Sequence, residues 1–460
     1  MRLALCLASM LLATGGLAQT VVEGRVTDVS TGETLPAATV QVDGTSRGTT
    51  TNGDGVYRLV VPTGGDTLVV RFLGYETARL AIPDGGGRLD VALAPAVAAL
   101  GEAVVTAGVN PADDIMRRVI ARKARWRSGL ETWQAEVYSR QTIRADGQVV
   151  AVIEGQTDAF WDRQRGLREV VTATRRTGNL GALPLDAFTA ADQALNLYDD
   201  DVPFGGYDLP GPTHPRALSY YRFSLDGSRI LGTDRVYDLS FAPRNPLQPA
   251  LEGSLSVLAG ANAVLAVSAR PSDAVQFPLV NQFALTLDQQ FATFGQSASG
   301  EEVWLPVDFR MSGQGRIGNA LLQFPDIGFA VNSRFTDFAV NVAVPDSLFD
   351  QDGAVVDSVS VAGSVPIVGV VPLSAEEERA LAEIDSTETL ASALRPTGLL
   401  ARFVQIGGTD GSSSGGGGDS AGIRYSVDPA LWYNRVEGAH LGGEATLRVD
   451  RHRLAGALGY

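Results

Sequence analysis

The sequence is almost free of cysteine: its single cysteine, Cys6, lies in an apolar stretch near the N-terminus. Residues 1–18 combine the basic Arg2, apolar residues 3–12 and small residues before Gln19, which is the layout of a cleavable signal peptide. A buried N-terminal helix is the alternative. Cys6 precedes the predicted cleavage point, which excludes a lipoprotein anchor. The mature chain would then lack cysteine, which excludes disulfides and thiolate metal sites.

Basic residues are also scarce. The 460 residues carry 37 Lys and Arg against 52 Asp and Glu, a net charge of −15, and the basic residues form no block. A nucleic-acid partner is therefore excluded, because neutralising phosphates needs clustered cations. After the signal there is no run of about 18 apolar residues, so any membrane insertion must use β-strands. The length suggests about three domains.

Catalytic motifs are missing as well. The three histidines, His214, His440 and His452, lie in no zinc-peptidase motif, and no phosphate-binding loop is present. The acidic pair Glu301-Glu302 and the run 199–201 could act as paired carboxylates or bind calcium. Solvated surface is the preferred interpretation of both, because no ligand spacing surrounds them. We therefore predict no enzyme, no catalytic, cofactor-binding or metal-binding residue, and no cofactor.

Residues 19–95 have the pattern of a small β-sandwich. Short β-branched and aromatic runs alternate, and the turn sequence Asn-Gly-Asp-Gly at 52–55 marks a hairpin. The predicted core is Val26, Val40, Val42, Tyr57, Leu59, Leu68, Val70 and Phe72.

The same segment resembles a known family. Gly24, Leu35-Pro36, Gly44-Thr45, the turn at 52–55 and Gly74-Tyr75 follow in the order found in carboxypeptidase-regulatory-like domains. Such domains are accessory modules without peptidase activity. The resemblance implies a periplasmic N-terminal domain of an outer-membrane protein, and many TonB-dependent transporters carry one.

Residues 96–132 are predicted to form a linker with one amphipathic helix. Asn110 is an N-cap and Pro111 occupies the first helical position. Ile115, Val119 and Ile120 share one face, whereas Arg117, Arg118, Arg122, Lys123 and Arg125 populate the others. A solvated basic face is the preferred interpretation, and contact with anionic lipid head groups is the alternative.

Residues 133–345 have the pattern of one curved antiparallel sheet or half-barrel, with Trp304 at a strand end. The order of its strands resembles lipoprotein-carrier-like periplasmic proteins. Any ligand is expected to be apolar, because no polar constellation converges in this segment. The acidic, proline-rich residues 198–215 are predicted to be a solvated loop.

Residues 346–422 are predicted to be a second linker. A capping box at Ser374 and Glu377 begins a short acidic helix that runs to about Ala391, and a flexible Gly/Ser stretch fills 407–422.

Residues 423–460 are predicted to begin an outer-membrane β-barrel that is cut short in this chain. Residues 439–449 alternate strictly over the length of a transmembrane strand, and Trp432-Tyr433 resembles an aromatic girdle. Leu441, Ala445, Leu447 and Val449 would face lipid, with Glu444 and Arg448 facing the lumen. A soluble hairpin packed on the middle sheet is the alternative.

The order of these segments resembles an outer-membrane protein family of unknown function that has this N-terminal domain and a C-terminal β-barrel. The resemblance implies a mainly β protein of the outer membrane with periplasmic recognition domains. We predict a binding or structural protein that acts in envelope assembly, surface display or uptake. Outer-membrane lipid is the expected partner, with an envelope protein or an apolar ligand as further candidates. A TonB-dependent transporter and a secreted hydrolase with an accessory domain are the alternative hypotheses.

Overall fold

A computed structural model gives the architecture of the protein. It describes residues 20–95, 110–180, 195–349, 355–356, 371–384 and 390–397, with short gaps at 37, 46, 53, 62–63, 73–74, 232–233, 277–279 and 320–321. It also describes the backbone of strands within 423–459. The predicted signal peptide and the Gly/Ser stretch lie outside these residues.

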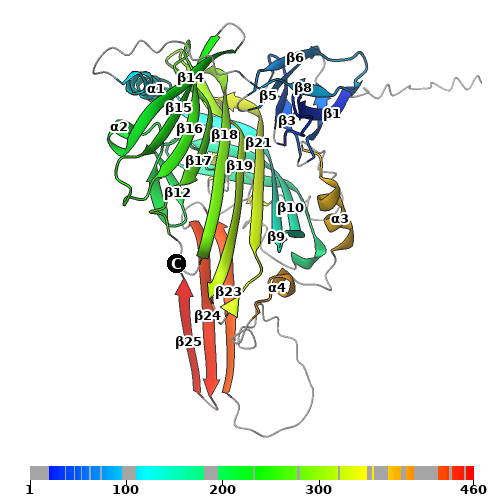
Figure 1. The fold of residues 1–460 in the computed structure, drawn as a ribbon, viewed down its shortest axis with the longest axis vertical. Coiled ribbons are helices and arrows are strands. Elements are labelled where there is room, and N and C mark those ends of the chain that lie inside the picture. The colour runs from blue at the N-terminus through cyan, green and yellow to red at the C-terminus, as the bar shows by residue number, and fades with distance from the viewer. Residues whose placement is uncertain are drawn as a thin grey trace, which may run out of the picture.

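The N-terminal domain consists of two small sheets that face each other across an apolar core (Figure 1). One sheet has the order β4-β1-β7, with β8 also pairing β1, and the other has the order β3-β2-β5-β6. The predicted core is confirmed, since seven of its eight residues are buried and Phe72 packs against them half-buried. The strands are β1 (Thr20–Asp28), β2 (Thr39–Val42), β3 (Gly48–Thr50), β4 (Val56–Val61), β5 (Thr67–Arg71), β6 (Ala78–Ala81), β7 (Gly87–Arg88) and β8 (Val91–Leu93).

The predicted turn before β4 is also confirmed. The side-chain Oδ1 of Asn52 accepts hydrogen bonds from the backbone N–H groups of Asp54 and Val56, at 3.0 and 2.8 Å. Gly55 adopts a φ of 72°, a conformation that glycine reaches without a steric penalty. Asn52 therefore sets the geometry of the turn with its oxygen and keeps its amide N–H₂ free for a contact outside the domain.

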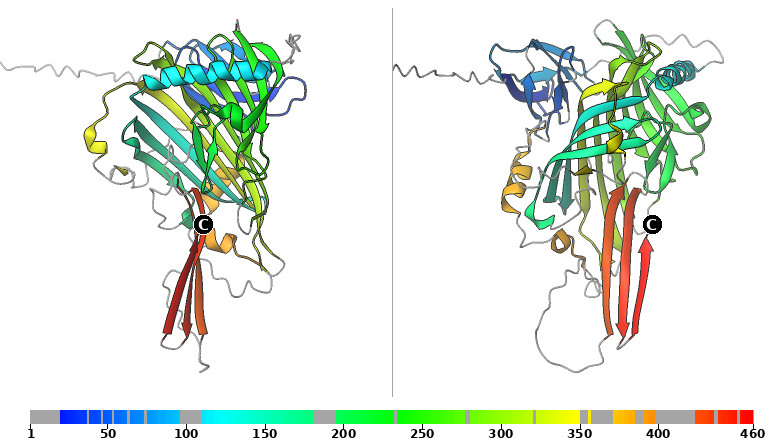
Figure 2. Two further views of the ribbon diagram at one scale, coloured as in Figure 1. Left: turned by 90° about the vertical axis from the view of Figure 1, so that its left-hand side faces the viewer. Right: turned by 180° about the vertical axis from the view of Figure 1, so that it is seen from behind.

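Helix α1 (Pro111–Ser128) begins as the sequence predicts. The Oδ1 atom of Asn110 accepts a hydrogen bond from the Ala112 N–H, and Pro111 occupies the first turn, where no N–H is needed. Ile115 and Val119 are buried and Ile120 packs half-buried against the same core. The helix lies across the strands near one end of the large sheet (Figure 2).

The middle region forms one large open sheet, which confirms the predicted antiparallel sheet. Among the described residues its order is β14-β15-β16-β17-β18-β19-β21-β9-β10-β11-β22, so β14 and β22 are its two edges. Pairing is antiparallel except for the short β11–β22 contact. The strands are β9 (Thr132–Ala145), β10 (Gln148–Asp162), β11 (Gly166–Arg176), β14 (Tyr221–Leu231), β15 (Asp234–Pro243), β16 (Leu251–Leu258), β17 (Ala263–Pro271), β18 (Val280–Gln296), β19 (Glu302–Asn319), β20 (Leu322–Gln323, beside β19), β21 (Ile327–Val340) and β22 (Val355–Val356).

The segment 198–215 is not the solvated loop that its composition suggested. It contains the hairpin of β12 (Asp201–Phe204) and β13 (Tyr207–Pro210), and helix α2 (Ala217–Tyr220) follows. Tyr198 and Leu209 are fully buried in the main core. Scattered apolar residues among the aspartates and prolines anchor the segment, and composition alone does not reveal this.

Helix α3 (Ala375–Glu383) starts with the predicted capping box, because Ser374 and Glu377 exchange side-chain-to-backbone hydrogen bonds. The helix ends at Glu383, earlier than predicted, and α4 (Leu390–Ala393) follows as a separate turn. The helices that the structure describes include none long and apolar enough to cross a membrane.

The C-terminal strands β23 (Ile423–Asn434), β24 (Gly438–Val449) and β25 (His452–Gly459) form a separate antiparallel sheet, seen in red in Figure 1. The predicted strands are thus present in the backbone. The side chains predicted to face lipid or lumen lie outside the described residues.

Candidate functional site

The large sheet has one apolar and one polar face, and the pairing register assigns each residue to a face. Phe309 of β19 lies opposite Ser333 of β21, and their neighbours Asp308 and Arg334 point to the other side. We call the side that packs under α1 the inner face and the opposite side the outer face. Buried inner-face residues include Leu285, Leu287, Phe291, Phe309, Met311, Val331, Phe335 and Val137.

Helix α1 covers one end of the inner face. Ala112, Ile115, Met116, Val119 and Trp126 are all buried in the same core as the inner-face residues. The helix contacts β14, β17 and β19, so it crosses the part of the sheet from β14 to β19. The hairpin β12-β13 completes the cover with Val202, Phe204 and Leu209.

Polar contacts attach α1 to the rim of the sheet. The carboxylate of Glu301, which precedes β19, pairs with Arg122 and also with Arg125, the latter at 3.1 Å. Arg118 donates to Asn262 in the turn before β17 at 3.2 Å. These contacts surround the apolar seam between the helix and the sheet, and they explain why the helix carries so many arginines. Glu301 thus works as an ion-pair partner on the surface.

Lys123 is a correction to the predicted solvated basic face. Its side chain is buried, and Nζ donates to Asp200 Oδ1 at 2.6 Å, to Thr213 Oγ1 at 3.0 Å and to the Thr213 carbonyl at 3.2 Å. Burial lowers the pKa of Lys123 to about 8, and the Asp200 hydrogen bond opposes that shift. Helical periodicity placed Lys123 correctly on the helix, but nothing in the sequence announced that the acidic segment would fold over it.

Two aspartates of the predicted acidic loop, Asp199 and Asp200, also contact helix α1. The Asp200 carboxylate accepts a hydrogen bond from Lys123, and Asp199 forms an ion pair with Arg127 of the same helix. Their side chains are 49% and 19% exposed, so they are partly covered rather than fully solvated. Among the described residues, no three His, Cys, Asp or Glu side chains gather closely enough to hold a metal ion. The aspartates anchor the hairpin to α1.

A cluster of aromatic side chains lies at the margin of the cover. Trp133 of β9 stacks on Trp161 of β10 with ring centroids 6.5 Å apart, and Phe338 of β21 meets Trp133 edge-on at 5.6 Å. Phe294 of β18 approaches Phe338 at 4.5 Å. These four rings are only partly buried, although they pack against the main core. They are therefore partly accessible apolar side chains beside the main core.

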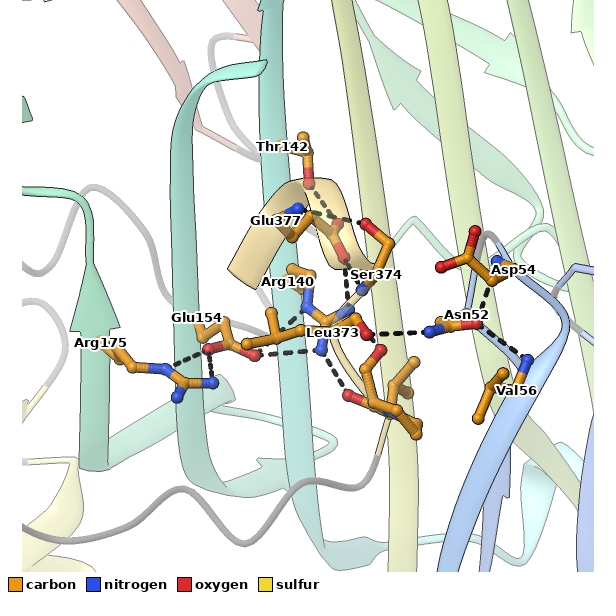
Figure 3. Close-up of polar contacts among 12 residues, drawn as sticks. Asn52, Asp54, Val56, Arg140, Thr142, Glu154, Arg175, Leu373, Ser374 and Glu377 are labelled. Carbon is orange, nitrogen blue, oxygen red and sulfur yellow. Dashed lines mark hydrogen bonds and ion pairs between the residues drawn. The ribbon is translucent and has the colours of Figure 1, made fainter. Parts of the chain in front are cut away.

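The outer face carries a buried ionic junction (Figure 3). Arg140 of β9 donates to Glu154 of β10 at 3.1 Å and to Glu377 of α3 at 3.1 Å. Thr142 donates to the second Glu377 oxygen at 2.9 Å, and Arg175 of β11 pairs with the second Glu154 oxygen. The exposed fractions of the Arg140 and Glu154 side chains are 3% and 1%. The charges of the two arginines and the two glutamates cancel, and this junction fixes α3 on the sheet.

The N-terminal domain reaches the same junction. Asn52 donates its free amide N–H to the backbone carbonyl of Leu373 at 2.9 Å, next to the capping residue Ser374 (Figure 3). Elsewhere on the outer face, Thr39 donates to Gln290 of β18 at 2.6 Å. The contacts between the N-terminal domain and the sheet are thus mainly polar.

Two families match the chain. Residues 22–105 match the CarboxypepD_reg-like domain, and residues 144–324 match a family of unknown function, DUF5686. No curated protein matches significantly.

Solved structures share only a distant likeness with the chain. A DUF1329 family protein from Desulfovibrio piger is 10% identical, with 52% of this chain and 98% of that chain covered and a TM-score of 0.26. A putative outer membrane lipoprotein-sorting protein domain from Vibrio parahaemolyticus is 14% identical, with 52% and 97% covered and a TM-score of 0.26. A LolA superfamily protein from Nitrosomonas europaea is 12% identical, with 52% and 98% covered and a TM-score of 0.21.

Of the other residues singled out in the sequence, the structure describes the side chains of His214 and Trp304. His214 accepts a hydrogen bond from the Arg216 N–H at 2.8 Å and stacks edge-on against Tyr220, which orders the start of α2. His440 and His452 lie in β24 and β25, where side chains are outside the described residues. Trp304 is the third residue of β19, which confirms its predicted position at a strand end, and its side chain is buried.

Proposed function

We propose that the protein is a binding protein of the cell envelope that holds an apolar ligand, such as an acyl chain, between the inner face of the large sheet and its cover. The carrying observation is the partly buried aromatic margin of Trp133, Trp161, Phe294 and Phe338, which continues the apolar inner face beyond α1. The aromatic rings offer a large apolar surface without hydrogen-bonding demands.

The polar rim supports the same proposal. The ion pairs of Glu301 with Arg122 and Arg125 lie at the edge of this cover, and the Arg125 side chain is 58% exposed, so water screens part of this attachment. We propose a binding role rather than a catalytic one, in keeping with the ion pairs that Glu301, Asp199 and Asp200 form with α1.

Titration with a fluorescent fatty acid tests this function. Saturable binding is expected, and Trp133→Gln should weaken it by roughly tenfold, the equivalent of about 1.4 kcal/mol of lost aromatic contact. Gln134→Ala is the matched control, because Gln134 is the next residue of β9 and points to the outer face. Binding that does not saturate, or equal losses in both variants, would contradict the proposal. Thermal melts of both variants separate lost binding from lost folding.

We further propose that strands β23–β25 attach the protein to the outer membrane, with the other domains in the periplasm. The strict alternation of residues 439–449 supports this, and strands of 12 residues are long enough to cross a bilayer. Fractionation of the protein expressed in a Gram-negative host is the test. Leu447→Arg should reduce membrane recovery far more than Thr446→Arg, since a lipid-facing charge costs about 2–4 kcal/mol at the bilayer midplane. Recovery in the soluble fraction without detergent would refute attachment.

A further inference from the structure

Arg334 lies on the outer face of β21, beneath the N-terminal domain, and its charge has no hydrogen-bonding partner there. The side chain is 1% exposed, and Nε, Nη1 and Nη2 all lack an acceptor. Burial lowers the pKa of Arg334 to about 10, with Asp308 opposing the shift and Arg310 and Arg71 adding to it. The guanidinium therefore stays charged at neutral pH. Asp308 already accepts a hydrogen bond from Arg310 at 2.9 Å.

The N-terminal domain is what buries this charge. A Cβ atom on Gly48 of β3 would lie 2.3 Å from Nη2 of Arg334, so the guanidinium packs directly against the backbone of that glycine. Around the Arg334 guanidinium, the Thr39 hydroxyl donates a hydrogen bond to Gln290, and Arg47 pairs with Asp337 at 2.9 Å. The side chains of Arg47 and Asp337 are 48% and 31% exposed, respectively. Water can replace each of these polar contacts at little net cost.

The two units also have separate cores. The N-terminal core contains Val26, Val40, Tyr57 and Leu68, and the core under α1 shares no residue with it. Separating the units would therefore expose mainly polar surface and leave both cores packed.

We propose that the N-terminal domain docks reversibly on the sheet, and that buried Arg334 is a built-in destabilising element that favours its release as a folded unit. A buried guanidinium whose three nitrogens find no hydrogen-bond acceptor destabilises the state that buries it, and the neighbouring Asp308 carboxylate offsets only part of that cost. Undocking returns the guanidinium to water and leaves the rest of the fold unchanged. The inference is independent of what the inner face binds.

Thiol labelling measures this release directly, because Cys6 is the only native cysteine and Cys6→Ser removes it. In that background, Thr39→Cys reports undocking, since Thr39 is 2% exposed and contacts Gln290 across the interface. Val40→Cys, on the next residue of β2, reports unfolding, since Val40 is fully buried in the N-terminal core. Reversible docking predicts that Thr39→Cys is labelled much faster than Val40→Cys.

A second substitution tests the role of the charge. Arg334→Met should slow labelling of Thr39→Cys by roughly tenfold or more, because the docked state no longer buries a guanidinium whose N–H groups lack acceptors. Equal labelling of Thr39→Cys and Val40→Cys would overturn reversible docking. Labelling that is unchanged or faster in Arg334→Met would overturn the role of Arg334 and would indicate that bound water or an anion pairs its guanidinium.

Discussion

Replacing Arg140 with methionine should destabilise the protein more than any comparable substitution on the outer face of the sheet. Arg140 is the one residue that joins Glu154 of β10, Glu377 of α3 and the carbonyl of Pro372, the last at 2.9 Å. Methionine keeps much of the length of the side chain but none of its donors. The substitution leaves Glu154, which is 1% exposed, with less than its full set of partners.

The expected magnitude follows from that burial. Removing one partner of a buried ion pair costs about 3–5 kcal/mol, because the other charge stays buried without compensation. Arg175 and the Tyr138 hydroxyl still contact Glu154, which places the loss near the lower end, at about 3 kcal/mol. Glu377 keeps only its bonds to Thr142 and the backbone of Ser374.

Arg144→Met is the matched control. Arg144 lies on the same face of β9 and also pairs with a glutamate of α3, Glu376 at 2.8 Å, but the two side chains are 37% and 40% exposed. An exposed pair contributes about 0–1 kcal/mol, so this variant should lose little stability. Chemical denaturation gives the free energy of unfolding, and hydrogen exchange in residues 375–383 shows whether α3 has detached. Equal losses in the two variants would refute the argument from burial.

Three further substitutions test single contacts. Burial lowers the pKa of Lys123 from 10.5 to about 8, so between these pH values the unfolded chain binds more protons than the folded chain. The free energy of unfolding should therefore rise with pH in this range, by about 3 kcal/mol at most. Lys123→Met should abolish this rise, and a rise that persists in the variant would contradict the role of Lys123. The Tyr75 hydrogen bond lowers the pKa of Asp28 to about 2, so the contribution of Asp28 to stability is complete above pH 3.8 and is lost as the pH falls toward 2. Asp28→Asn should weaken the acid dependence of N-terminal domain unfolding, whereas an unaltered pH profile would count against the contact. Asn110→Ala should lower the free energy of unfolding by about 1–2 kcal/mol, measured by thermal melts, and Asn110→Asp should restore the cap. If aspartate does not restore stability, the loss belongs instead to the hydrogen bond from the Asn110 amide N–H to the Phe223 carbonyl.

Local patterns predicted the elements well. The Asn52 turn, the Asn110 cap and the Ser374 capping box depend on residues within a few positions of one another, so the sequence contains the whole cause. The core of the N-terminal domain followed from alternation, because each strand buries one face. The strands of the large sheet were predicted for the same reason.

Contacts between distant segments were not predictable in this way. Lys123 and Asp200 are 77 residues apart and Arg140 and Glu377 are 237 apart, and either pair reads as ordinary surface charge in the sequence. One weak signal was available in β9, where Arg140, Thr142 and Arg144 follow one another on the same face. Three polar residues at a spacing of two indicate a face that meets polar partners.

Strand β9 has a consequence for how the sequence can change. On its outer face Arg140, Thr142 and Arg144 bind α3. On its inner face Val137 is buried and Trp133 packs against the same apolar cluster. The turn at Asp146 and Gly147, with φ values of 48° and 83°, fixes its register against β10. One inserted or deleted residue in the strand would exchange the two sets, so that both faces lose their partners at once. Length changes should therefore be tolerated in the segments that connect the domains and eliminated from β9.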